Sequence, residues 1–399
     1  MLDTSIDRTF KYLLYSRAFR SMALIYMSLA FSLYLTELNV KLINIGLIAA
    51  ATMLFMVFLT LLLGYIGDRY GFKKELLLAE LFATTGAVII ALSISVAPIV
   101  IGMVIGGLGG SAGGMRGAFS PGTNAFIASN YKEERDRVMK YSLVTLTASG
   151  FAIGGSIMFS LVTPIGKAFG MLFAYRFMFG VAALMLTASF VFLLLLNEAK
   201  RPKKTTKVMK RSSLNYTAKV VTASALGGIG VGVFMPLLPL WFKLMYNASA
   251  LQIGILFSIV YIATALGSYL SSRFAHLFTA LGTASNSRII GGALLFAMAI
   301  SPLMIIAGLI YVARAIIAGF GSPSRTAVNV RGINNEDYGT ATSVQGIAGR
   351  VSQLSSGASG YLMDLSLPMP LLIGGIFQLA SGISYKILFK KRSSKRSTH

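Results

Sequence analysis

Long apolar stretches alternate with short polar segments along most of this chain. A helix needs about 20 apolar residues to cross roughly 30 Å of hydrocarbon. Eleven stretches reach this length and a twelfth, residues 287–302, is somewhat shorter; the break at Ser301-Pro302 is all that separates this ninth span from the tenth. The predicted spans are residues 18–38, 43–66, 75–96, 98–127, 139–163, 172–196, 217–242, 250–272, 287–302, 304–328, 339–363 and 368–389. The pattern therefore predicts an all-α integral membrane protein with twelve transmembrane helices.

One polar and basic segment, residues 198–213, interrupts this pattern near the middle of the chain. Six predicted spans lie on each side of it. We therefore expect an N-terminal six-helix bundle over residues 1–197, a linker over 198–213, and a C-terminal six-helix bundle over 214–399.

The two halves also share short features in the same order. Ser120-Pro121 in the fourth predicted span and Ser322-Pro323 in the tenth are 202 residues apart, as are Gly155 and Gly357 in spans five and eleven. A duplicated six-helix unit would produce this order, so we expect the two bundles to be pseudo-symmetric.

The amino-acid composition indicates that the chain lies in a lipid bilayer, and the positions of the basic residues predict which side of the membrane each loop faces. The chain is 55% hydrophobic and 12% charged with a mean hydropathy of +0.73, whereas soluble proteins carry about 25% charged residues. Of the basic residues in the loops, in the terminal segments and near the ends of the spans, 27 fall on the side of the two termini and the linker, and Lys41, Lys167 and Lys243 fall on the other. Basic loops mark the cytoplasmic side. We therefore expect a multi-pass protein of the cell membrane with both termini cytoplasmic.

The distribution of charge also limits the classes of partner that we expect. A net charge of +23 in a soluble chain would suggest nucleic acid, but here the charges sit in short loops between apolar spans. We expect the lipid bilayer and a small-molecule substrate as partners, no nucleic acid, and a monomer. The chain has no cysteine, and its two histidines, His276 and His399, lie outside the predicted spans. We therefore expect neither an enzyme nor a metal site or cofactor.

A glycine-containing turn with one carboxylate and several cations follows the second predicted span. Its sequence is Gly64-Tyr-Ile-Gly-Asp68-Arg69-Tyr-Gly71-Phe72-Lys73-Lys74. This loop resembles the signature loop of the major facilitator superfamily, with Phe72 where a basic residue is common. The resemblance, with twelve spans and a central linker, covers the whole chain. It implies a carrier whose loop helps to close the cytoplasmic gate, with Asp68 in that role near the start of span eleven.

Two further segments resemble motifs of the same family. Arg314-Ala-Ile-Ile-Ala-Gly319-Phe-Gly321 in span ten is similar to an arginine–glycine motif that the family usually shows in span four. Gly150-Phe151-Ala-Ile-Gly154-Gly155 in span five is similar to the family's antiporter motif, with Phe151 in place of proline.

Arginines inside the predicted spans are the sharpest chemical signal. Arg314 and Arg350 lie near the middles of spans ten and eleven, and Arg116 lies in the inner half of span four. Each costs on the order of 3 kcal/mol to insert, so we expect them to face a wet cavity; the alternative is a structural role on backbone carbonyls. By the family resemblance, spans one, four, seven and ten line the site. The candidate cavity residues are Arg116, Arg314, Arg350, Tyr26, Tyr311, Gln345 and Gln353.

Acidic residues inside the spans are few. Glu37, near the outer end of span one, and Glu80, about one turn inside span three, are the candidates for carrying a coupling proton. Either side chain could instead reach a membrane interface.

These features together predict a secondary active transporter that moves a small organic solute by alternating access. Efflux by proton antiport is the first expectation. The alternatives are an uptake carrier for an organic anion or sugar, and a receptor or sensor built on a transporter fold. A coupling proton or another ion is the expected additional partner.

Overall fold

The computed structural model of the chain describes residues 4–107, 119–131, 134–198, 209–274, 277–334 and 337–389. Within these ranges the regular structure is helical, without a strand. The first eight helices are α1 (Thr4–Glu37), α2 (Leu42–Tyr70), α3 (Phe72–Leu92), α4 (Val96–Gly106), α5 (Phe119–Asn130), α6 (Glu134–Ser160), α7 (Val162–Phe169) and α8 (Met171–Leu194). The remaining helices are α9 (Arg211–Phe234), α10 (Leu238–Tyr246), α11 (Ala250–Phe274), α12 (Ala280–Ala299), α13 (Met304–Val330), α14 (Tyr338–Ser352), the 3₁₀ helix η3 (Gln353–Ala358), α15 (Ser359–Leu365) and α16 (Met369–Phe389).

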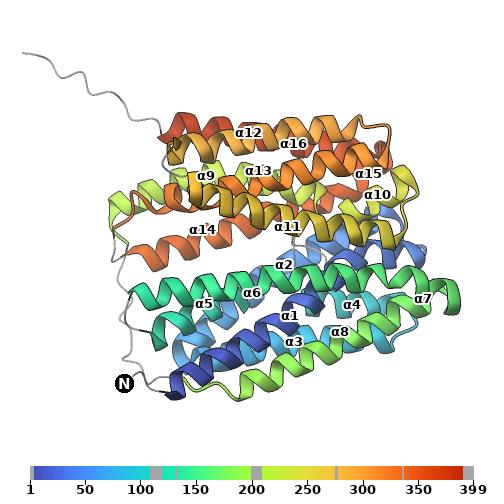
Figure 1. Ribbon diagram of the computed structural model, residues 1–399, viewed down its shortest axis with the longest axis horizontal. Helices are drawn as coiled ribbons and strands as arrows, with labels where there is room; N and C mark the ends of the chain where they lie inside the picture. The colour runs from blue at the N-terminus through green and yellow to red at the C-terminus, as the bar shows by residue number, and fades with distance from the viewer. Residues whose placement is uncertain are drawn as a thin grey trace, which may run out of the picture.

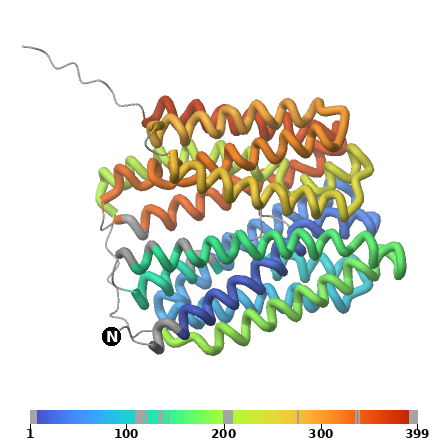
Figure 2. Tube along the Cα trace, in the orientation of Figure 1, coloured from blue at the N-terminus to red at the C-terminus, as the bar shows by residue number. Residues whose placement is uncertain are grey.

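The long helices run side by side along the long axis of the molecule (Figure 1). Helices α1 to α8, blue to green, lie together in the lower part of the view, and α9 to α16, yellow to red, lie above them (Figures 1 and 2). Helix α1 packs on α6 and α8, and α12 packs on α13 and α16. We call these two groups of helices the first set (α1–α8) and the second set (α9–α16).

Nine helices in the described part of the chain are long and apolar enough to cross a membrane. The other three predicted spans coincide with less regular or less apolar segments. The fourth covers α4, α5 and residues 108–118, which lie outside the described residues; the ninth is α12, whose first half is rich in Ser, Thr and Asn; the eleventh is interrupted by η3. The all-α membrane fold is thus confirmed, and the count of twelve stays a prediction.

The helix boundaries repeat between the two sets. Helices α2 and α11, α3 and α12, and α4 and α13 begin at Leu42 and Ala250, Phe72 and Ala280, and Val96 and Met304, each pair 208 residues apart. The turns before α2 and α11 repeat as well, since Asn39 and Asn247, also 208 apart, both have positive φ values, of 59° and 53°. Asparagine tolerates this left-handed conformation better than most residues. The offset of 202 between Ser120 and Ser322 then means that the first copy is six residues longer between α4 and α5 than the corresponding part of α13.

The molecule has two ends, which differ in how the sets meet. We call the end where α1 begins and α8 ends the linker end, and the opposite end, with α7, α10 and α15, the far end (Figure 1). At the far end Glu37 of α1 forms an ion pair with Lys243 of α10, and the Leu251 amide donates to Thr163 Oγ1 at 2.9 Å. The Ser160 hydroxyl also donates to the carbonyl of Leu251 at 3.5 Å, so several polar contacts join the two sets at this end.

Glycines allow helices of the two sets to touch directly at the far end. A Cβ on Gly46 of α2 would lie 2.7 Å from the amide nitrogen of Gly360 in α15, and a Cβ on Gly360 would lie 1.9 Å from the carbonyl oxygen of Leu42. Both distances are shorter than any side chain can accept, so this contact needs glycine on both helices. The described structure is therefore closed at the far end.

Candidate functional site

A carboxylate from the end of the first set holds the loop that resembles the family signature. Glu198 accepts hydrogen bonds from the amides of Phe72 and Lys73 at 2.8 and 2.9 Å. These amides belong to the first turn of α3, whose positive end favours a negative charge. Gly71, with φ of 110°, makes the turn between α2 and α3, and Lys73 Nζ donates to the carbonyl of Leu194 at 2.7 Å.

The other loop candidates lie at the surface. Asp68 is exposed, and no hydrogen bond or ion pair joins it to another described residue. Arg69 donates to the hydroxyl of Tyr65 at 2.6 Å, Lys74 lies over the ring of Tyr70, and Gly64 faces open space. The capping carboxylate is therefore Glu198 in this conformation, and the gating role of Asp68 stays a prediction.

A buried ion pair lies inside the first set. Arg20 of α1 pairs with Glu80 of α3, and the two side chains are 5% and 0% exposed. Arg20 also lies over the ring of Phe119, with Cζ 4.3 Å from the centroid. In this conformation the Glu80 carboxylate is thus buried against Arg20, and its role as a proton carrier stays a prediction. Arg20 was not identified from the sequence as the partner of Glu80; the opposite charges inside spans one and three were the available signal.

The second set carries an arginine at the equivalent place, but on the other helix. Gly227 of α9 and Arg288 of α12 stand 207 and 208 residues after Arg20 and Glu80. A Cβ on Gly227 would lie 1.7 Å from Arg288 Nη1, so the guanidinium fills the space that the glycine leaves. Arg288 Nη1 donates to Gln378 Oε1 at 3.2 Å, and Gln378 Nε2 donates to the carbonyl of Gly227 at 3.0 Å. The side-chain amide of Gln378, itself held by the Gly227 carbonyl, therefore stands where the carboxylate of Glu80 serves the first set.

Arg314 is the candidate with the clearest unsatisfied chemistry. It projects from α13 over the ring of Phe234, the last residue of α9, with Cζ 4.9 Å from the centroid. Its side chain is partly buried, and its Nε has no hydrogen-bond partner among the described residues. The sequence contains no Asp or Glu between residues 199 and 335. A buried guanidinium without a carboxylate is costly, and an anionic ligand would relieve that cost.

The remaining cavity candidates divide into two kinds. Tyr26 and Tyr311 are packed in the core, 0% and 1% exposed, where Tyr26 donates to the carbonyl of Tyr175 at 3.0 Å and the Tyr311 hydroxyl lies 3.7 Å from Met235 Sδ. Arg350 and Gln345 of α14 are partly buried, and Gln345 donates to the carbonyl of Asn329 at 3.1 Å.

Gln353 begins η3, and its backbone lies against Gly232 of α9. Arg116 lies outside the described residues. A cavity role for each of these seven residues stays a prediction. Glu37, the other candidate for carrying a proton, has a side chain about one quarter exposed and forms an ion pair with Lys243.

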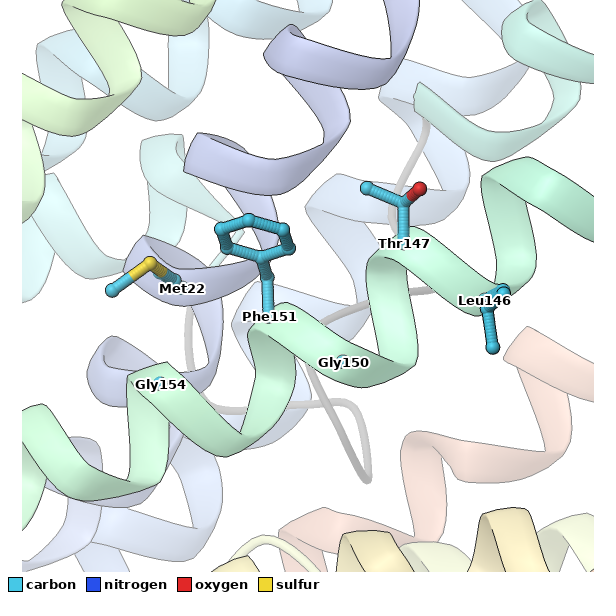
Figure 3. Close-up of a pocket in the computed structure, with 6 residues that line it drawn as sticks. All are labelled: Met22, Leu146, Thr147, Gly150, Phe151 and Gly154. Atoms are coloured by element: carbon cyan, nitrogen blue, oxygen red, sulfur yellow. The ribbon is translucent and has the colours of Figure 1, made fainter.

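A cavity of about 410 Å³ lies along α6 beside α1. Gly150, Phe151 and Gly154 of the segment that is similar to the antiporter motif line it, and the Met22 side chain reaches it from α1 (Figure 3). A Cβ on Gly155 would lie 2.4 Å from the Met22 carbonyl oxygen, whereas one on Gly150 would meet open space. Gly155 thus allows α6 to pack closely against α1, and Gly150 leaves the space of the cavity unfilled. Ser156 and Ser160, further along α6 toward the far end, contact Gly254 of the second set.

Two related sets of membrane-length helices, in contact at one end and with arginines inside, are the architecture of an integral membrane transporter. A profile of the Major Facilitator Superfamily matches residues 13–357, and the chain belongs to that superfamily. The family and fold define a transporter, not an enzyme.

Solved structures with the same fold have low sequence identity to this chain. The POT-family transporter PepTSo is 13% identical with a TM-score of 0.73, over 96% of this chain and 97% of that one. A D-xylose–proton symporter is 15% identical with a TM-score of 0.72, over 97% of each. The human organic anion transporter MFSD10 is 15% identical with a TM-score of 0.65, over 96% and 98%. No curated protein matches the sequence.

Proposed function

We propose that the protein is a secondary active transporter that carries a small organic anion across the cell membrane, with Arg314 as the principal binding group and Arg350 as the second. One observation carries this proposal: the Arg314 guanidinium lies on the Phe234 ring without a carboxylate partner among the described residues. A planar guanidinium binds carboxylates through two parallel hydrogen bonds while its face stays on an aromatic ring. The similar structures include carriers named for a sugar and for organic anions, so they do not select between these substrates.

The contacts between the two sets support alternating access as the transport mechanism. Residues 1–197 and 214–399 would move as two bodies, and the described far-end contacts would break when the site opens to that side. The basic residues at the linker end favour that end, with both termini, as cytoplasmic. The described conformation would then give access from the cytoplasm.

Uptake into proteoliposomes tests the transporter and its substrate class. Purified protein is reconstituted, and counterflow is measured with a panel of labelled monocarboxylates, dicarboxylates, neutral sugars and organic cations. We expect saturable counterflow with an anion and none with a cation. Counterflow restricted to sugars would support the uptake alternative instead, and binding without any flux would favour a receptor.

We further propose export in exchange for protons, with Glu80 as the proton carrier. The support is local: Glu80 is fully buried and paired with Arg20, so protonating it would release a buried arginine and change the packing of α1 on α3. An imposed pH gradient should then drive anion movement in wild-type vesicles. A Glu80→Gln variant should still exchange anion for anion but no longer respond to the gradient, whereas a gradient response that survives in this variant would exclude Glu80.

A further inference from the structure

A second cavity, of about 220 Å³, lies at the linker end of the second set, away from Arg314. It forms where α11 ends, α12 begins and α13 passes both. Its lining combines hydroxyl groups with aromatic rings: Ser271, Thr283, Ser324, Phe274, Phe278 and Phe320.

Two kinds of hydrogen-bond donor at this cavity have no partner in the described structure. Ser271 is 5% exposed, and its hydroxyl makes no hydrogen bond with a described residue. Helix α12 begins at Ala280, where Thr279 caps the amides of Gly282 and Thr283 at 3.2 and 2.9 Å. The amides of Ala280 and Leu281 remain without a described partner, at the positive end of a 20-residue helix. Such amides with a nearby hydroxyl bind phosphate oxygens well.

The surrounding charge favours an anion. Arg273 follows the lining residue Ser272 in the last turn of α11; it is exposed and forms no ion pair with a described residue. Arg325 follows the lining residue Ser324 and binds Ser287 and the carbonyl of Ala318 at 3.1 and 3.0 Å. Because residues 199–335 contain no acid, no carboxylate of this segment competes for the site.

The position of the cavity indicates where the anion comes from. Phe274, Leu277 and Phe278 beside the cavity are 40%, 61% and 56% exposed. Large apolar side chains at the end of a membrane helix bundle lie in the interfacial layer, next to acyl chains. We propose that this cavity binds the phosphate of an anionic phospholipid from the leaflet at the linker end. The amides of α12, the Ser271 hydroxyl and Arg273 hold the phosphate, and the exposed apolar side chains contact the acyl chains.

Native mass spectrometry of the delipidated full chain, titrated with phosphatidylglycerol, tests the proposal. Ser271→Ala combined with Arg273→Gln should weaken the first bound lipid about tenfold, because two donors to the phosphate are lost. Lys219→Gln removes an exposed charge from α9 in the same set and should leave that affinity unchanged. Phosphatidylcholine carries the same phosphate but no net charge, so it should bind more weakly than phosphatidylglycerol.

Three outcomes would overturn the proposal. An equal loss in Lys219→Gln would reduce the binding to diffuse charge attraction, and unchanged affinity in the double variant would exclude the cavity. Inorganic phosphate that displaces phosphatidylglycerol at millimolar concentration would identify a free phosphate as the ligand. The melting temperature of each variant, together with Ser271→Ala alone, separates lost affinity from lost folding.

Discussion

Arg20 and Glu80 form an ion pair that is buried inside the first set of helices. At the equivalent place in the second set, Arg288 enters from the other helix and fills the space over Gly227. The first set therefore neutralises its buried arginine with a carboxylate, and the second set uses the amide of Gln378. Arg288 and Arg314 thus both lie in a segment, residues 199–335, that contains no Asp or Glu.

Removing one partner of the buried pair should be more damaging than removing both. Glu80→Gln leaves Arg20 as an uncompensated buried charge and should cost about 3–5 kcal/mol of stability. Arg20→Met with Glu80→Met should recover most of this loss, because an apolar pair of similar volume is often neutral. Thermal unfolding in detergent measures both, and a double variant as unstable as the single one would argue against the pair.

Gly227 should not tolerate a methyl group. Gly227→Ala places a Cβ against Arg288 Nη1 and should destabilise the protein by about 1–3 kcal/mol, the usual cost of overpacking. Gly291→Ala in α12 is the matched control, because a Cβ there meets nothing within 4 Å and alanine favours a helix by about 1 kcal/mol. Adding Arg288→Met to Gly227→Ala should restore stability; failure of this rescue would mean that the clash lies elsewhere.

Arg314 should be sensitive to loss of its planar geometry as well as of its charge. Arg314→Lys keeps the charge but not the paired donors or the contact with Phe234, so anion affinity should fall about tenfold. Arg331→Lys, at an exposed position, should leave affinity unchanged. Affinity and melting temperature measured on the same samples decide the matter: lower stability with wild-type affinity would show that Arg314 is a packing residue.

The ion pair between Glu37 and Lys243 should hold the far end closed. Because its side chains are 25% and 29% exposed, it should contribute about 0.2–1 kcal/mol. The chain lacks cysteine, so Ala50→Cys, in contact with Gly357, gives a single labelling site. Glu37→Gln should raise its maleimide labelling rate from the far side about two- to fivefold. Glu37→Gln with Lys243→Gln should add little more; independent, additive effects would disprove the coupling.

Asp337, before α14, should stabilise the protein in a pH-dependent way. The Ser213 hydroxyl and the amide of Lys210 hold the pKa of this carboxyl below its ordinary range. A lowered pKa means stability that is present above about pH 4 and is lost as the pH falls through the folded value. The melting temperature of Asp337→Asn should therefore lie below wild type at pH 7 and converge with it below about pH 3. A constant difference across this range would show that charge is not involved.

Apolar patterning predicted most of the fold. The exact boundaries could not be predicted, but the helix pattern, the repeat between the two halves and the family could be recognised from the sequence, because membrane insertion requires long uninterrupted apolar segments. The breaks within the membrane helices were harder to predict from the sequence. Ser-Gly runs such as Gln353–Ala358 read as continuous helix in sequence, and the change to 3₁₀ geometry depends on close packing against α2 and α9.

The candidate site was predicted less well, because pairing depends on which helices are neighbours. Arg314 stood out in the sequence as a charge in an apolar span, and its role in a cavity stays a prediction. Arg20 and Glu198 were missed, since each acts on a residue at least 60 positions away. Tyr26 and Tyr311 were chosen for position along a span, but the face that a ring presents is set by the tertiary packing.

The pairing of Arg20 with Glu80 also has a consequence for synthesis. The two residues are 60 positions apart, so at about 5–20 residues per second the carboxylate leaves the ribosome roughly 3–12 s after the arginine. During that interval α1 has no Glu80 to neutralise its charge, and it is disfavoured at the centre of the bilayer. The first helix should therefore wait at the translocon or at the membrane surface until α3 arrives, and the two should enter the lipid together.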